Sequence, residues 1–390
     1  MMVYDWGVTR ITKSLYSESD MKARYVILGC AVILVLGIIT LVVGGLLFNK
    51  FVLSKAGSYK RSSPGKPGIV AGQGFLAKST YLQDSRLGAI SDIVTGQLDG
   101  KPGQDIGFAG AQGALIISQS AKSFIPLSGN LDRVNIIDVE NDGVCEFMNR
   151  GSWSCAASLM DHAGRTVWTY GGSSGVDDMA AGDINKDGKL EFAVGFNGGG
   201  GIHLVSTSGV KVWSRTDGNV WHVEMVDTNG DGKLEVVHSN AAGVMTIRDG
   251  AGGVLKTGRP ADYFSHFSLC AWPAKSSPRY ALSAGEGAIR LYGYDGATVL
   301  QLKAPKCGRL FSANGAPVKL KAGQPEYLAV VVDSGHGAGS ILYVYDSKKL
   351  LVYQEVLPSG SSIAGLSVGA SGKEQLLVGG EGKVWSYTAK

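Results

Sequence analysis

The feature that most constrains this sequence is a nine-residue acidic motif that occurs three times without gaps. The copies are residues 138–146 (DVENDGVCE), 183–191 (DINKDGKLE) and 227–235 (DTNGDGKLE), and their first aspartates are 45 and 44 residues apart. A constant period of this length is typical of repeat architectures. Helical repeats have similar periods, so the residues between the copies must decide the fold class.

Those residues predict short β-strands. Each copy leads into an apolar run such as 192–195, then a Gly-rich or polar turn, a second run such as 202–205, and a last one such as 211–213. Such runs separated by turn signals are typical of antiparallel meanders, and a few strands per 44 residues match one propeller blade. Gly, at 57 of 390 residues, fits many tight turns.

Weaker copies extend the pattern from about residue 90 to the C-terminus and give seven units. We therefore predict an all-β fold, a seven-bladed β-propeller over residues 68–390, with six or eight blades as alternatives. The chain ends on a strand, so segment 74–85 is expected to supply the missing outer strand of the last blade. Ring closure of this kind removes exposed strand edges.

The motif also predicts calcium ligands. Calcium takes six to eight oxygen ligands, and alternate residues of a tight loop turn their oxygens inward. Positions 1, 3, 5 and 9 supply side chains, position 7 a backbone carbonyl, and Gly at position 6 allows the turn. The expected ligands are Asp138, Glu140, Asp142, Val144 and Glu146; Asp183, Asn185, Asp187, Lys189 and Glu191; and Asp227, Asn229, Asp231, Lys233 and Glu235. Asx-turns that bind no metal are the alternative.

Residues 183–195 (DINKDGKLEFAVG) resemble the FG-GAP repeat of integrin-alpha-type calcium-binding propellers. The resemblance covers roughly residues 90–390 and is strong in three units. It implies a seven-bladed propeller that holds two to three calcium ions, usually outside the cytoplasm. The sequence contains no Arg-Gly-Asp, so an integrin-like role does not follow, and resemblance of this kind supports architecture more than function.

The N-terminal part predicts a membrane anchor. Residues 25–48 (YVILGCAVILVLGIITLVVGGLLF) carry no charge, and about 20 apolar residues span a bilayer. A signal peptide would have a shorter apolar core and a small-residue cleavage site. Residues 1–24 are predicted to be cytoplasmic and 49–67 to form a basic Gly/Ser/Pro tether. Flanking charge is nearly balanced, so the calcium motifs decide the orientation, with the propeller periplasmic or extracellular.

Three recurrent tryptophans, Trp168, Trp213 and Trp385, are expected at equivalent places in their units as blade-to-blade packing. Four body cysteines leave open two disulfides, Cys145–Cys155 and Cys270–Cys307, or free thiols. The six histidines are scattered along the sequence and predict no zinc or catalytic cluster. The net charge of +4 without a basic stripe argues against nucleic-acid binding.

These features predict a non-enzymatic, membrane-anchored scaffold. Its propeller would dock on other proteins, as an accessory subunit of a membrane complex such as a respiratory or photosynthetic one. The alternatives are a surface adhesion module and a polysaccharide lyase or hydrolase that uses the propeller channel. No catalytic residue and no organic cofactor is predicted, and a small-molecule substrate is not expected.

Overall fold

The computed structural model describes residues 64–390 except 130, 151–155, 173, 261–263, 265, 309–311, 335–338 and 369–371. These described residues belong to one compact unit, Ser62–Lys390. The predicted cytoplasmic segment 1–24, the predicted span 25–48 and most of the tether lie outside them. Within the described part of the chain, no helix is long and apolar enough to cross a membrane.

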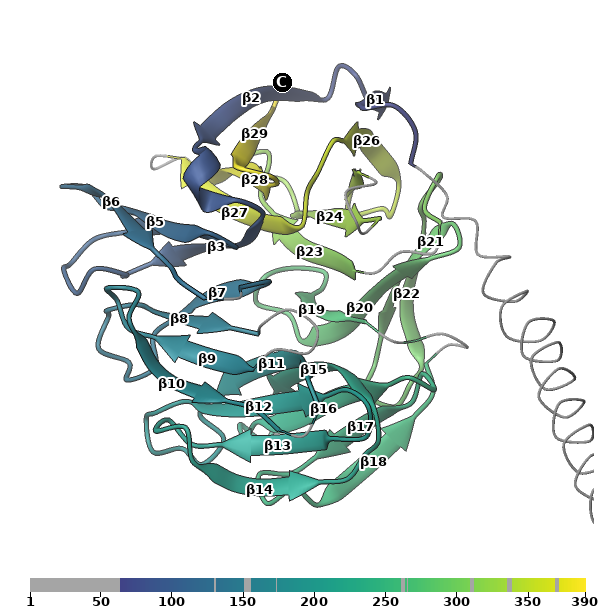
Figure 1. Cartoon of the computed structure of the whole chain (residues 1–390). Coiled ribbons are helices and arrows are strands. Elements are labelled where there is room, and N and C mark those ends of the chain that lie inside the picture. The colour runs from purple at the N-terminus through teal and green to yellow at the C-terminus, as the bar shows by residue number, and fades with distance from the viewer. Residues whose placement is uncertain are drawn as a thin grey trace, which may run out of the picture. The chain divides into compact units, whose positions relative to one another are not determined.

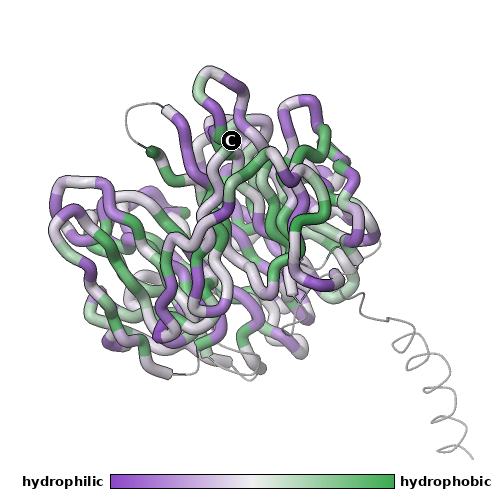
Figure 2. The backbone as a smooth tube through the Cα atoms, turned by 90° about the horizontal axis from the view of Figure 1, so that it is seen from above, coloured by the Kyte–Doolittle hydropathy of each residue, from purple (hydrophilic) through white to green (hydrophobic). Residues whose placement is uncertain are grey.

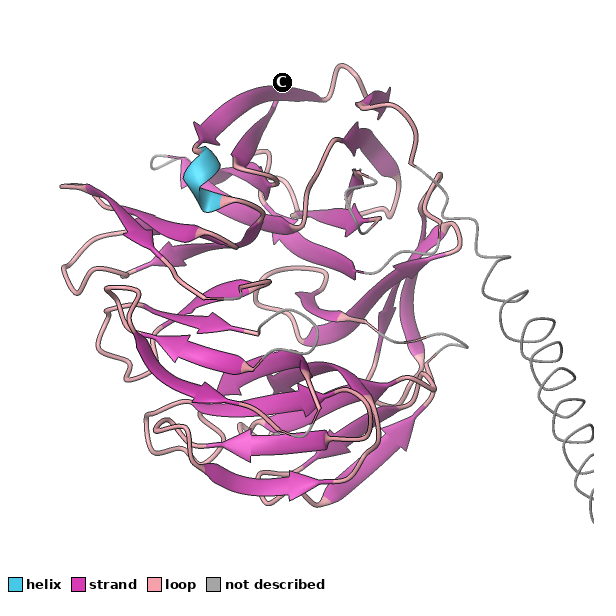
Figure 3. Cartoon of the chain, in the orientation of Figure 1, coloured by secondary structure: helices cyan, strands magenta, loops and turns pink. Residues whose placement is uncertain are grey.

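Seven antiparallel sheets are arranged as the blades of a propeller, which confirms the predicted all-β, seven-bladed fold (Figures 1 and 3). The described residues contain one short 3-10 helix, η2 (Ser85–Leu87). In Figure 2, hydrophobic stretches run through the strands and hydrophilic residues gather in the turns. This alternation is what short, half-buried strands joined by tight turns require.

The first four blades follow one another in sequence, each with its innermost strand first. Blade 1 holds β3 (Ile90–Gly96), β4 (Asp105–Gly110), β5 (Gly113–Ile117) and β6 (Lys122–Pro126). Blade 2 holds β7 (Val134–Ile137), β8 (Glu146–Asn149), β9 (Ala157–Met160) and β10 (Thr166–Tyr170). Blade 3 holds β11 (Val176–Gly182), β12 (Glu191–Phe196), β13 (Gly201–Val205) and β14 (Lys211–Arg215). Blade 4 holds β15 (Val220–Val226), β16 (Glu235–Asn240), β17 (Met245–Arg248) and β18 (Val254–Gly258).

Blade 5 follows the same pattern, whereas blades 6 and 7 each combine C-terminal strands with one strand from the N-terminal side. Blade 5 holds β19 (Ser268–Ala271), β20 (Arg279–Gly285), β21 (Ala288–Tyr292) and β22 (Thr298–Lys303). Blade 6 holds β23 (Ser312–Val318), β24 (Tyr327–Asp333), β25 (Ser340–Tyr345), β26 (Leu351–Leu357) and the added outer strand β1 (Gly68–Ala71). Blade 7 holds β27 (Ser362–Val368), β28 (Lys373–Gly379), β29 (Lys383–Ala389) and β2 (Leu76–Gln83).

Strand β2 closes the ring as predicted. It pairs antiparallel with β29 from Leu76 opposite Ala389 to Gln83 opposite Lys383. The ion pair between Lys78 Nζ and Glu355 Oε1, 2.5 Å apart, joins this strand to blade 6. The fifth strand of blade 6, β1 on the outer edge of β26, was not anticipated from the sequence. Its four residues (GIVA) include the strand formers Ile69 and Val70, but so short a run does not stand out in the sequence.

The hydrophobic core is divided among the interfaces between blades. Seven clusters of buried side chains are present in the described residues, and each draws on two neighbouring blades. Close approach of the sheets explains some glycines within strands: a Cβ on Gly195 would lie 2.7 Å from Val220 Cγ1 in the next blade. The fold is therefore stabilised mainly by blade-to-blade packing.

Because every strand pair is antiparallel, the connections alternate between two ends of the ring. We call the end that carries the connections between first and second strands the loop end. The opposite end, where the innermost strands begin, is the mouth end. Pro64 is at the mouth end, since it approaches Gly339 in the connection between β24 and β25.

Candidate functional site

All three predicted calcium loops lie at the loop end, where each connects the first and second strands of blades 2, 3 and 4. They share one backbone form. Gly at position 6 has φ of 82°, 89° and 77° in the three loops, as the sequence predicted. Position 4 also has positive φ, at Asn141, Lys186 and Gly230. The sequence analysis did not single out this second left-handed position.

In all three blades the first carboxylate of the motif accepts from the N–H of position 6 and the last from the N–H of position 2. In the second loop, Asp183 accepts from the backbone N–H groups of Asp187 and Gly188, both at 3.0 Å. Glu191 accepts from the Ile184 N–H at 3.3 Å. Equivalent bonds join Asp138 to Asp142 and Gly143, Asp227 to Gly232, Glu146 to Val139, and Glu235 to Thr228.

The middle positions also follow one pattern. The position 5 carboxylates Asp142, Asp187 and Asp231 each accept from the N–H of position 7, which belongs to Val144, Lys189 and Lys233. Position 3 differs between loops. Asn185 and Asn229 each donate to the position 5 aspartate at 3.1 and 3.3 Å, whereas Glu140 occupies this place in blade 2.

Burial makes these loops unusual for surface turns. Glu191 and Glu235 are only 5% and 3% exposed. Burial, and next the neighbouring Glu140, Asp138 and Asp142 carboxylates, raise the pKa of Glu146 to about 7. As the side chains are oriented, the described residues contain no group of three or more His, Cys, Asp or Glu arranged to hold a metal. The donor types fit calcium, but the oxygens are engaged with the loop backbone.

Blade 1 carries a fourth, degenerate loop. Asp105 accepts from the Leu98 N–H at 2.9 Å, seven residues earlier, as Glu146, Glu191 and Glu235 do in their blades. The position 1 aspartate is replaced by Gln97. Neighbouring loops are joined directly, since Cys145 N–H donates to the Leu98 carbonyl at 3.1 Å. The loop is hard to recognise in the sequence because Gln97 and Lys101 replace the aspartates of positions 1 and 5, although Asp99 and Asp105 remain at positions 3 and 9.

At the mouth end, a second polar cluster surrounds Asp178 on β11. Its carboxylate contacts the Arg150 guanidinium from blade 2 and Nδ1 of His222 from blade 4, and accepts from the Val223 N–H at 3.0 Å. His222 Nε2 lies 3.2 Å from Glu224 Oε1. One carboxylate therefore joins three consecutive blades.

The electrostatics of this cluster follow from those contacts. Burial opposes ionisation of Asp178, but Arg150 and His222 outweigh it and hold the pKa of Asp178 well below its ordinary value. Burial likewise opposes protonation of His222, while Asp178 and Glu224 raise its pKa. Burial, and next the charge of His222, lower the pKa of His266 to about 3. The cluster thus behaves as an ion-pair network with a charged His222 beside a neutral His266.

Side chains on the innermost strands join successive blades around the channel. These bonds are Ser91 Oγ to the Val134 carbonyl, Ile136 N–H to Asp92, Ser268 Oγ to the Ala313 carbonyl, Asn314 Nδ2 to the Ser361 carbonyl, and Ser362 Oγ to the Ile90 carbonyl. The last of them crosses the closure between blades 7 and 1. Most polar groups of the channel wall therefore have a structural task.

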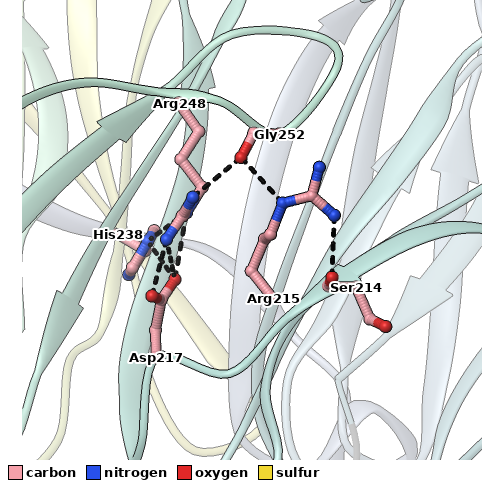
Figure 4. A network of polar contacts seen from close by, with 6 residues as sticks. All are labelled: Ser214, Arg215, Asp217, His238, Arg248 and Gly252. Carbon is pink, nitrogen blue, oxygen red and sulfur yellow. Dashed lines mark hydrogen bonds and ion pairs between the residues drawn. The ribbon is translucent and has the colours of Figure 1, made fainter.

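Another buried ion-pair network lies between blades 3 and 4 (Figure 4). Arg248 Nη2 lies 2.5 and 2.6 Å from the two carboxylate oxygens of Asp217. His238 Nε2 lies 3.1 Å from Asp217, and Arg248 and Arg215 both donate to the Gly252 carbonyl. Burial opposes ionisation of Asp217, but His238 and Arg248 outweigh it and lower its pKa. The contacts of Asp217 and Arg215 tie blade 3 and the segment that follows it to blade 4, which indicates a structural role.

The mouth-end cluster opens onto a cavity of about 760 Å³. Its lining includes Arg133, Arg150, His222, His266 and Asp333. Cavities of this size accept small molecules. These residues are distant in the sequence, so no local motif signals them. The one detectable relation is the repeat period, because Asp178 and the N–H of Val223 are 45 residues apart.

The predicted blade-to-blade packing holds for all three tryptophans, whereas the predicted equivalence of their positions holds for only two. Trp168 on β10 donates to the Thr207 carbonyl of blade 3 at 3.0 Å, and Trp213 on β14 donates to the Gly250 carbonyl of blade 4 at 2.9 Å. Trp385 instead lies on β29, the third strand of blade 7. The outer strand of blade 7 comes from the N-terminal side, so the tryptophan falls one strand further in.

The open question about cysteines is answered in part. Cys145, Cys270 and Cys307 are free and buried thiols. Burial raises the pKa of Cys270 to about 12, as expected for a thiol that fills apolar space. Of the two possibilities left open for Cys270 and Cys307, a disulfide or free thiols, the structure has the free thiols. Cys155 lies outside the described residues.

No protein-family model matches this chain, and no curated protein matches it. Solved structures do resemble it. BBS1N in complex with ARL6DN, soaked with mercury, has a TM-score of 0.55 at 13% identity, covering 82% of this chain and 96% of that chain. A streptogramin B lyase has a TM-score of 0.54 at 9% identity, covering 81% and 98%. At such identities the likeness shows the propeller fold alone.

Proposed function

We propose that this chain is a membrane-anchored, non-enzymatic interaction subunit. Residues 25–48 anchor it, with the N-terminus in the cytoplasm, and the propeller docks on partner proteins on the periplasmic or extracellular side. The docked partners are other subunits of a membrane complex, for example a respiratory or photosynthetic one. Propellers are well suited to this task, and BBS1N, which has a similar fold, was solved in complex with ARL6DN.

The observation that carries the proposal is a row of exposed apolar side chains on consecutive outer strands. The second residue of the outermost strand is apolar and exposed in blades 2, 3, 4 and 5. These four residues, which we call the rim row, are Val167, Val212, Leu255 and Val299, exposed by 56%, 56%, 54% and 45%. Scattered exposed apolar residues are normal, but a row repeated at one position of successive edge strands suggests a contact surface.

Blade 6 supports this interpretation. There the outer edge of β26 is already occupied by β1, which pairs with it from Gly68 opposite Val356 to Ala71 opposite Gln354. The outer edge of a blade in this ring can therefore accept an added strand. An extended segment of a partner would pair with an open edge in the same way, and the rim row would supply apolar contacts.

Calcium is part of the proposal. The motif residues of blades 2 to 4 supply the oxygen donors that calcium prefers, and the buried Glu191 and Glu235 carboxylates would complete the shells. Bound cations would offset the repulsion that raises the pKa of Glu146. Their role would be to stiffen three consecutive blades, with no chemical step assigned to the metal.

The docking surface is tested by changing the rim row. We expect the triple variant Val167→Lys, Val212→Lys and Leu255→Lys to lose the proteins that co-purify with the full chain in mild detergent. The matched control carries Leu350→Lys and Val368→Lys, which are exposed apolar residues outside the row. Retention of every partner by the triple variant, with a folded propeller by circular dichroism, would refute the rim row as the docking surface.

A second candidate is an extracytoplasmic lyase or hydrolase that acts on polysaccharide in the channel. The polar cavity around His222 and His266 favours it. Purified chain that cleaves a polysaccharide, and loses this activity in His222→Gln, would establish the enzyme and reject the non-enzymatic function.

A further inference from the structure

The cavity at the mouth end has donor groups that the protein does not use. Arg150 Nε is buried and has no hydrogen-bond partner among the described residues, although the same guanidinium contacts Asp178. Arg133 also lines the cavity. A buried donor without an acceptor costs stability, so Arg150 Nε on this cavity points to a missing acceptor.

Both arginines line this one cavity, and their positive charges repel each other. Burial lowers the pKa of Arg133, and the positive charge of Arg150 is the next cause. The carboxylate of Asp178 is already shared between the positive charges of Arg150 and His222. An added carboxylate would relieve the repulsion between the guanidinium groups, and arginine binds carboxylates with two parallel hydrogen bonds.

The acidic residues that line the cavity limit the negative charge that a ligand can carry. Asp92, Asp132, Glu224 and Asp333 line the same cavity, and they would repel a phosphate or a dicarboxylate. The uncharged polar lining includes Asn135, Asn314 and Ser312. Amide and hydroxyl groups of this kind pair with ligand hydroxyls. The cavity of about 760 Å³ has room for a ring-sized molecule.

We propose that the mouth-end cavity is a binding site for a small monocarboxylate that carries hydroxyl groups. The ligand carboxylate binds Arg133 and Arg150 Nε, and its hydroxyls bind the uncharged polar side chains. The site is independent of the rim row and of the calcium loops, so it stands or falls apart from the docking function.

Isothermal titration calorimetry on the full chain in detergent tests the site, with glucuronate as the probe. We expect saturable binding that is about 10- to 100-fold weaker in Arg133→Gln. The matched control is Arg165→Gln, an exposed arginine paired with Asp161 on a turn of blade 2, which should bind as the unaltered chain does. If Arg133→Gln fails to fold, Arg133→Lys replaces it in the test. Lysine keeps the positive charge but lacks the two parallel N–H donors of a guanidinium, so this variant should also bind more weakly.

Glucose and inorganic phosphate define the ligand class. Weaker or absent binding of both would support a hydroxylated monocarboxylate. Binding of glucose equal to that of glucuronate would show that the arginines do not recognise the carboxylate. Equal binding of phosphate would show a general anion site. No heat from glucuronate would mean that the cavity does not bind this ligand. Equal affinity in Arg133→Gln would mean that Arg133 does not bind the carboxylate. Each of these results overturns the proposal.

Discussion

At the scale of single residues, buried charges hold blades together. Asp178 joins three blades through Arg150, His222 and the Val223 N–H. Removing one member of such a buried network leaves the others uncompensated and is strongly destabilising. The charged groups of the channel wall are therefore first of all structural, and only their unused donors are available to a ligand.

His222 makes the stability depend on pH. Its folded-state pKa is raised, because Asp178 and Glu224 outweigh burial. The protonated side chain stabilises the fold fully below its unfolded pKa of about 6.5, and this contribution is lost as the pH rises through the folded pKa. We expect the free energy of unfolding, measured with urea, to fall as the pH rises from the unfolded pKa to the folded pKa of His222. His222→Gln should remove the fall, and exposed His162→Gln should keep it. Identical profiles for all three chains would contradict this role.

Lys186 is held in a left-handed backbone conformation that costs a non-glycine residue stability. Its φ is 62°, and the third loop has Gly230 at the same position. We expect Lys186→Gly to raise the free energy of unfolding by about 1 kcal/mol. Lys189→Gly, at a neighbouring position without positive φ, should be neutral or destabilising. A loss of stability in Lys186→Gly, measured by urea denaturation, would show that the strain is not relieved.

At the scale of elements, the nine-residue loops and the outer strands are the repeated parts. The loop conformation could be predicted because the side chains and glycine of one short segment determine it. Asp105 and its bond to Leu98 could not, since the rest of that motif has diverged. Trp168 and Trp213 were placed correctly for the same local reason, whereas Trp385 was misplaced because the closing strand comes from elsewhere in the chain.

Calcium is expected to stabilise the loops by binding the native state. At a hundredfold excess over Kd, one site adds about 2.7 kcal/mol. A chelator should therefore lower the melting temperature, measured by scanning calorimetry. Asp231→Ala should reduce this response, whereas Asp295→Ala, in a turn of blade 5, should leave it unchanged. No calcium in the purified protein and no chelator effect would favour the Asx-turn alternative.

Ring closure by β2 gives a sharp prediction about truncation. A chain that begins at Phe75 keeps β2, and one that begins at Ser85 loses it with the buried Leu76 and Leu82. We expect the second chain to be less stable by about 5 kcal/mol or more, or not to fold. Urea denaturation compares the two, and both lack the predicted anchor, which makes the longer one the control. Equal stability would contradict closure by this strand.

At the scale of the whole molecule, the sequence predicted seven blades, with six or eight as alternatives, and the structure has seven. The closing strand was predicted within segment 74–85, where β2 lies. The mouth-end cluster was out of reach, because Arg150, Asp178 and His222 come together only through the curvature of the ring. The sequence predicted no zinc or catalytic histidine cluster, and it gave no sign that the rings of His222 and His266 lie 6.4 Å apart between centroids.

The central claim is that this propeller is an anchored subunit that binds other proteins. Purification of the full chain from its native membrane in mild detergent, followed by mass spectrometry, tests it most directly. We predict extraction only with detergent and co-purification of defined partner proteins in fixed stoichiometry. A chain that is released without detergent, or that purifies alone, would contradict the account.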